Sequence, residues 1–101
     1  MNDRLLSFLG LCKRAGYLIS GADTVVRTVK DKNALLVLTA NDFSDNSLKN
    51  VEKAAVQYGV PIRTLKHNKD ALSFALGKHC GVICVTDKGF ADKILTLMSE
   101  E

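Results

Sequence analysis

A largely apolar stretch at residues 34–40 constrains the fold of this chain more than any other part of the sequence. It is rich in Leu and Val and carries no charge, which is typical of a strand that is covered on both faces. A second uncharged run follows at residues 81–85. We therefore expect residues 34–40 to form the centre of a sheet with helices packed on both sides.

Helical and strand patterns alternate before and after this stretch. Apolar residues at helical spacing predict five helices, at about residues 3–14, 22–32, 48–58, 69–76 and 88–98. Short strands are expected at residues 17–19, 62–65 and 82–85. The expected breaks and caps are Gly16, Asn33, the polar loop 41–47, Gly59, Asn68, Gly77 and Asp87.

This order predicts an α/β fold, a three-layer α/β/α sandwich whose four-stranded sheet is largely parallel or mixed. No linker or repeat interrupts the 101 residues, so we expect one domain over residues 1–101. Ligands of such sheets favour the carboxyl ends of strands. The loops after Ile19, Ala40 and Val85, together with residues 78–80, are therefore candidate binding loops.

Charge and hydropathy narrow the class of protein. The net charge of +3 falls entirely within the first 38 residues, an arrangement that permits contact with a polyanion but contains no Lys/Arg block. The apolar runs are far shorter than the roughly 20 residues of a membrane span, and the N-terminus does not resemble a signal peptide. We expect a cytoplasmic protein that does not enter a membrane.

The sequence contains no recognisable catalytic or metal-binding motif. Cys12, Cys80 and Cys84 lack C-x-x-C spacing, and we interpret them as small core residues in a reducing compartment. His67 and His79 have no nucleophile or carboxylate at a suggestive spacing. We therefore expect no enzyme activity, cofactor or metal.

The segment from Ser20 to Lys30 has two distinct faces. Four small apolar residues share one stripe of the predicted helix, while Asp23, Arg27 and Lys30 project from the other side. Gly21 lies at the turn, where unpaired N–H groups at a helix start could meet a phosphate. The alternative interpretation is an ordinary surface helix with solvated charges.

Five motifs along the chain resemble the L-seven-Ae ribosomal protein family, and in particular its small bacterial YlxQ-like branch. The motifs are residues 11–16, 19–21, 36–42, 58–61 and 85–91. The resemblance covers essentially the whole chain in order. It implies an α/β/α sandwich that binds kink-turns, which are sharply bent RNA helices with tandem sheared G·A pairs.

The family signature is a glycine, a spacer, Asn-Glu, and a basic residue three positions later. Here the glycine corresponds to Gly21, the Asn to Asp23, the Glu to Thr24 and the basic residue to Arg27. Two of the four positions therefore depart from the signature. An ionised Asp cannot donate a hydrogen bond, and Thr lacks the carboxylate that accepts from guanine N–H groups.

A second contact implied by the resemblance is the loop before the last strand, residues 77–82. Lys78 could meet a phosphate, and His79 could stack on an unpaired base, although an exposed histidine without a partner is the plainer interpretation. The turn at Asn41 and Asp42 could complete the rim. The candidate RNA-binding residues are Ser20, Gly21, Ala22, Asp23, Thr24, Arg27, Lys30, Asn41, Asp42, Lys78, His79 and Cys80.

The resemblance thus implies a non-enzymatic, monomeric protein that binds structured RNA, either ribosomal RNA or another kink-turn RNA, and that is associated with the ribosome. Relatives with this fold also serve as protein-interaction modules. Loss of the Asn-Glu pair is what we would expect of such a module if its RNA binding had weakened.

Overall fold

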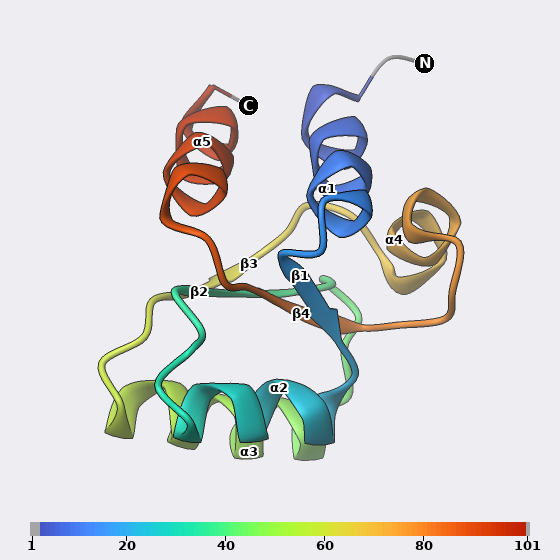
Figure 1. The fold of residues 1–101 in the computed structure, drawn as a ribbon. Coiled ribbons are helices and arrows are strands. Elements are labelled where there is room, and N and C mark those ends of the chain that lie inside the picture. Colours follow the sequence, from blue (N-terminus) through green and yellow to red (C-terminus); the bar gives the residue numbers. More distant parts are fainter. Residues whose placement is uncertain (1–2, 101) are drawn as a thin grey trace.

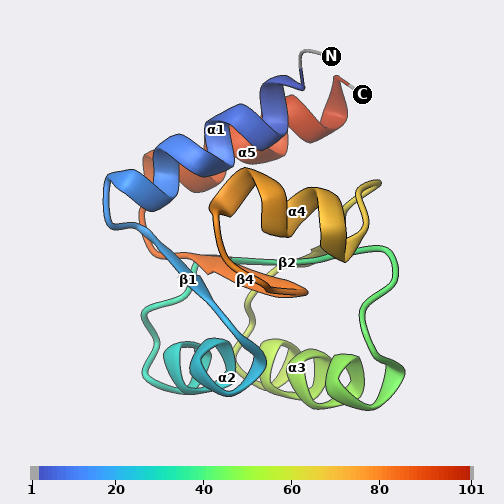
Figure 2. The ribbon, with the colours of Figure 1, turned by 90° about the vertical axis from the view of Figure 1, so that its right-hand side faces the viewer.

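The computed structural model describes residues 3–100 and contains five helices and four strands within them (Figure 1). The helices are α1 (Arg4–Arg14), α2 (Ala22–Lys30), α3 (Asp45–Gln57), α4 (Lys69–Leu76) and α5 (Lys88–Ser99). The strands are β1 (Leu18–Ser20), β2 (Leu36–Thr39), β3 (Ile62–Thr64) and β4 (Val82–Val85). Helices α2 and α3 cover one face of the sheet, and α1, α4 and α5 cover the other (Figures 1 and 2). The predicted three-layer sandwich is confirmed.

Local signals in the sequence set most helix ends. Asn68 and Asp87 cap α4 and α5, accepting the N–H groups of Ala71 at 2.8 Å and Phe90 at 3.0 Å. The expected C-terminal end of the second helix was wrong by two residues, because α2 stops at Lys30 and Lys32 adopts a left-handed φ of 64° that a right-handed helix does not contain.

The sheet has the order β1-β4-β2-β3 and is mixed. Only the β2–β3 pair is parallel, and β4 is antiparallel to both β1 and β2, so of the two expected arrangements, largely parallel or mixed, the sheet adopts the mixed one. The reason lies in the connection through α4. Residue Thr64 at the end of β3 and Val82 at the start of β4 both lie opposite Thr39, so the chain re-enters the sheet at the edge where it left.

The core has two parts, one on each face of the sheet. Strands β2 and β4 are interior strands and every residue in them is buried, as expected for the 34–40 stretch. On α2, Val25 and Val29 are fully buried and Ala22 and Val26 pack partly against the same core. All three cysteines are buried and free, as predicted. Within residues 3–100, no helix combines the length and apolar character that crossing a membrane requires.

Candidate functional site

Three segments that the sequence analysis singled out meet at one edge of the sheet. The Gly21 N–H donates to the Val82 carbonyl at 3.1 Å, and the Ala40 N–H donates to the Gly81 carbonyl at 2.9 Å. The turn before α2, the turn after β2 and the loop between α4 and β4 are therefore neighbours. We call this set, residues 20–22, 40–42 and 77–81, the carboxyl edge, because β1, β2 and β3 all end there.

The fourth expected loop, after Val85, lies at the opposite edge, so this prediction was wrong. The Leu35 N–H donates to the Val85 carbonyl at 2.8 Å, and the Thr86 N–H donates to the Tyr17 carbonyl at 3.0 Å. Tyr17 and Leu35 precede β1 and β2, so this is the edge where these strands begin. The antiparallel direction of β4 moves its carboxyl end away from those of the other strands.

Gly21 has a conformation that favours glycine, with φ 98° and ψ 136°. It forms the corner between β1, which ends at Ser20, and α2, which starts at Ala22. Among the described residues, no side chain caps the start of α2. The first-turn N–H groups are thus available to an anion at the carboxyl edge.

The polar residues of α2 are exposed, as expected, except Thr28, which is half-buried. Asp23 and Lys30 line a groove of about 430 Å³ between α2 and α3. From α3, the groove is lined by Asn50, Lys53, Ala54 and Gln57. Thr24 and Arg27 are exposed outside the described lining of this groove. Among the signature positions on α2, Asp23 is therefore the one that lines this groove.

Asn41 and Asp42 lie at the carboxyl edge, but part of each side chain is engaged within the protein. The Asn41 amide donates to the Lys66 carbonyl at 2.8 Å, and Asp42 Oδ1 accepts the Lys69 N–H at 2.8 Å. The Asn41 N–H also donates to the His67 carbonyl at 2.9 Å. These bonds fix the loop between β3 and α4 against the edge.

The 77–81 loop has an exposed tip and a buried anchor. Lys78 and His79 are exposed, whereas Cys80 is buried. The Ser73 hydroxyl accepts the Cys80 N–H at 3.0 Å and donates to its carbonyl at 3.3 Å. Burial raises the pKa of the Cys80 thiol, although the nearby Lys78 and Lys13 ammonium groups oppose this. The thiol thus stays neutral and serves the loop's packing rather than its charge.

Two residues that the sequence analysis missed pack on this loop. A Cβ added to Gly81 would lie 2.7 Å from Phe43 Cδ1 and 3.3 Å from Lys69 Cδ, so the Phe43 ring lies directly on the glycine backbone. Phe43 follows the candidate turn at residues 41–42, and Lys69 starts α4. A glycine at position 81, directly before the apolar run 82–85, indicates that another group can pack closely on the backbone there. It does not indicate which residue that group belongs to.

Sequence spacing suggested no catalytic companion for His67, but the fold places the carboxylate of Asp3 beside its ring. Its Nε2 lies 2.5 Å from Asp3 Oδ2, and both side chains are largely buried. Asp3 also caps α1 by accepting the Leu6 N–H at 2.9 Å. Partial burial raises the pKa of the Asp3 carboxyl, but the Leu6 N–H and the His67 side chain more than offset this and hold the pKa below its usual 3.8. The contact ties the start of α1 to the loop behind the carboxyl edge.

Replacing Asp3 with Asn is expected to lower the free energy of unfolding at neutral pH by about 0.3–1 kcal/mol, the usual contribution of a charge at a helix start. Asn keeps the capping oxygen, so the change isolates the charge. Because the folded-state pKa lies below 3.8, the stabilisation is complete above that pH and is lost as pH falls through the lower value. Urea unfolding at pH 7 and at several values below about 4 tests this. A difference between parent and variant that stays constant with pH would contradict it.

The sequence matches a known protein family and named relatives along most of its length. A family model described as the ribosomal protein L7Ae/L30e/S12e/Gadd45 family matches residues 3–95. RNA-binding protein YlxQ of Bacillus subtilis (strain 168) is 36% identical over 91 residues, covering 89% of this chain and 90% of the relative. YlxQ of Enterococcus faecium is 32% identical, covering 95% and 92%. The large ribosomal subunit protein eL30 of Zea mays is 29% identical, covering 98% and 90%.

Two solved structures share the fold of this chain. A protein of unknown function from Bacillus halodurans C superposes with a TM-score of 0.90 at 32% identity, covering 97% of this chain and 99% of the other. The Giardia lamblia 15.5kD RNA binding protein superposes with a TM-score of 0.75 at 19% identity, covering 99% and 89%, and shares the fold. The chain belongs to the ribosomal protein L7Ae/L30e/S12e/Gadd45 family.

Proposed function

We propose that this protein binds structured RNA of the kink-turn type and has no catalytic role. The observation that carries the proposal is the meeting of the Gly21 turn and the 77–81 loop at the carboxyl edge. Membership of the family and the similarity to two proteins named as RNA-binding support it. Similarity to a large-subunit ribosomal protein supports ribosomal RNA as the partner and the ribosome as the site of action.

The proposed contacts follow from the chemistry of the edge. A phosphate meets the free N–H groups at the start of α2, with Arg27 and Lys30 adding positive charge along the helix. On the other side of Gly21, Lys78 contacts a second phosphate and the His79 ring stacks on an unpaired base. A bent RNA can reach both groups at once, which is why we propose a kink-turn rather than a straight duplex.

A gel-shift titration with a standard kink-turn and with a straightened control of the same composition tests the proposal at a stated salt concentration. Tighter binding to the bent RNA is the expected result. Equal binding to both RNAs would reduce the interaction to non-specific charge. Absence of binding to either would favour the alternative function, a protein-interaction module of the same fold.

Replacing Arg27 with Ala is expected to weaken RNA binding by on the order of 1 kcal/mol, about fivefold, through loss of a phosphate contact. The slope of log affinity against log salt should fall in magnitude by about one unit. Arg27 is exposed, so the melting temperature should hardly change.

Lys93→Ala is the matched control, because Lys93 is an exposed cation on α5, in the helix layer across the sheet from α2. It should leave RNA binding unchanged. Unaltered RNA binding in Arg27→Ala together with a lower melting temperature would assign Arg27 to the fold and move the proposed surface elsewhere.

A further inference from the structure

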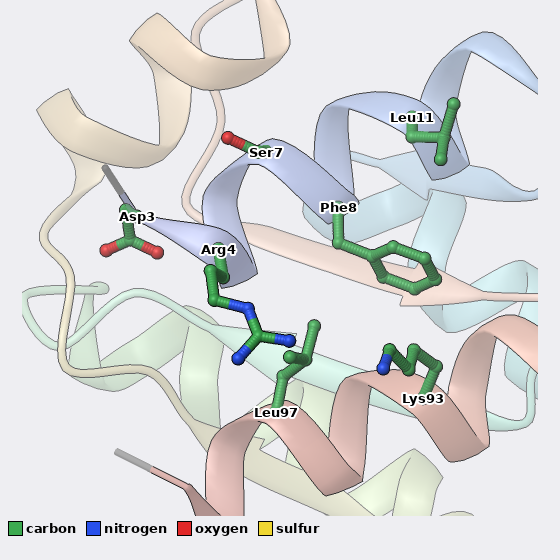
Figure 3. A pocket seen from close by; sticks show the side chains of 7 residues that line it. All are labelled: Asp3, Arg4, Ser7, Phe8, Leu11, Lys93 and Leu97. Carbon is green, nitrogen blue, oxygen red and sulfur yellow. The ribbon is translucent and has the colours of Figure 1, made fainter. Parts of the chain in front are cut away.

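A groove of about 380 Å³ runs between α1 and α5 (Figure 3). These two helices lie in the layer across the sheet from α2 (Figure 2). It lies on the side of α1 that carries Phe8 and Leu11, whereas Leu6 and Gly10 line the side facing α4. The groove is thus separate from the groove beside α2 and from the carboxyl edge.

The floor of the groove is apolar. Phe8 and Leu11 from α1 and Leu97 from α5 line it. The Phe8 ring packs on Phe90 with centroids 5.2 Å apart, and Phe90 in turn packs on Tyr17 at 5.7 Å. Leu11 is 47% exposed and Tyr17 is 42% exposed, so the apolar surface continues to the outside of the molecule.

Two cations from opposite helices border this floor. Figure 3 shows the Arg4 guanidinium reaching from α1 to the side of Leu97, and the Lys93 side chain below the Phe8 ring with its Nζ on the side toward Leu97. Arg4 Nη1 is 3.6 Å from Glu100 Oε1, and both side chains are more than half exposed. Such an exposed pair is weak, so another carboxylate can replace Glu100 at little cost. The carboxylate of Asp3, at the end of the groove, is already bound by His67.

An apolar groove between two helices with positive borders fits an acidic peptide better than RNA. Leu and Phe side chains can cover the floor, as in helix-in-groove recognition, while Asp and Glu meet the two cations. A nucleic acid would cover the apolar floor with charged phosphates, and two cations leave most of those charges unpaired. The contact of Arg4 with Glu100 already shows how a carboxylate sits at this border.

We propose that the α1–α5 groove is a docking site for an acidic segment of a protein partner that carries Leu or Phe anchors. The anchors cover Phe8, Leu11 and Leu97, and the carboxylates bind Arg4 and Lys93. This goes beyond the proposed RNA binding and does not depend on it, because the groove and the carboxyl edge share no residue.

The test is fluorescence anisotropy with a labelled acidic peptide of about twelve residues that carries two Leu and one Phe at helical spacing. The full chain should bind it saturably without RNA. Lys93→Glu and Leu11→Ser should each weaken binding about fivefold or more. Arg27→Glu is the matched control, an equal change of charge on an exposed residue of α2, and should have no effect. Lys93 and Leu11 are exposed, and unchanged melting temperatures would confirm that both variants fold.

Three results would overturn the docking site. The first is no saturable binding by the parent protein, and the second is equal weakening by Arg27→Glu and Lys93→Glu, which would indicate general charge attraction. The third is displacement of the peptide by single-stranded RNA, which would make the groove part of the RNA surface. A failure of kink-turn binding in the gel-shift titration leaves the peptide result unaffected, so the two proposals fail separately.

Discussion

Exchanging Asp23 for Asn together with Thr24 for Glu is expected to tighten kink-turn binding by roughly 1–3 kcal/mol, about five- to a hundredfold. Binding to a straight duplex should hardly change. Asn supplies donors in place of a negative charge, and Glu returns an acceptor for guanine N–H groups. The net charge is unchanged, so any gain must come from hydrogen-bond geometry. Paired gel-shift titrations of bent and straight RNA measure it.

Both positions are exposed in the first turn of α2, where Asn and Glu are well tolerated, so folding should not confound the result. Asp92→Asn with Thr96→Glu is the control, because it makes the same exchange on exposed residues of α5. That variant should bind both RNAs like the parent. The prediction is wrong if the double variant at residues 23 and 24 has the same ratio of affinities for bent and straight RNA as the parent. These positions would then make no contact that distinguishes the two RNAs.

Replacing Gly21 with Ala is expected to lower the free energy of unfolding by about 1–3 kcal/mol, because Ala is strained at a φ of 98° with ψ 136°. A Cβ here would meet no atom within 4 Å, so backbone strain and not a clash causes the loss. Relief of the strain by rotation would move the N–H that bonds to Val82 and tilt the start of α2. RNA binding should therefore fall as well. Urea unfolding and the gel-shift titration measure the two effects.

The Gly59→Ala variant separates the effect of backbone strain on stability from the effect of the Gly21 turn on RNA binding. Gly59 also has a positive φ, of 69°, with nothing near a Cβ, but it follows α3 at the far side from the carboxyl edge. The Gly59→Ala variant should have a lower free energy of unfolding, but the folded variant should bind RNA with the affinity of the parent. Unchanged stability of Gly21→Ala would mean that the turn tolerates a side chain, and equal RNA affinity would remove the turn from the binding surface.

Much of the fold could be predicted because its signals are local. The 34–40 run is apolar on both faces because β2 is an interior strand, and Asn68, Asp87 and Gly77 act within a turn of their own positions. The direction of β4 was not predictable in this way. It depends on where α4 returns the chain, and the sequence pattern of a buried strand is the same in either direction.

The candidate site shows the same division. The exposure of Arg27 and Lys30 follows from helical periodicity, and the meeting of Gly21 with residues 77–81 confirms that two predicted segments are adjacent. The contacts between Asp3 and His67, and between Phe43 and Gly81, join residues far apart in the sequence. Single residue types without a periodic pattern give no information on such pairs.

The position of β4 also sets the order in which the protein can be completed during synthesis. β4 is the last strand made, yet it lies between β1 and β2, and β1 pairs with no other strand of the sheet. While residues 82–85 are still inside the ribosome, β1 and one side of β2 are unpaired edges, and only the β2–β3 pair can form. The bonds from Gly21 and Ala40 to residues 81 and 82 form when β4 inserts. The nascent chain therefore acquires its complete four-stranded sheet and its candidate RNA-binding edge in a single late step.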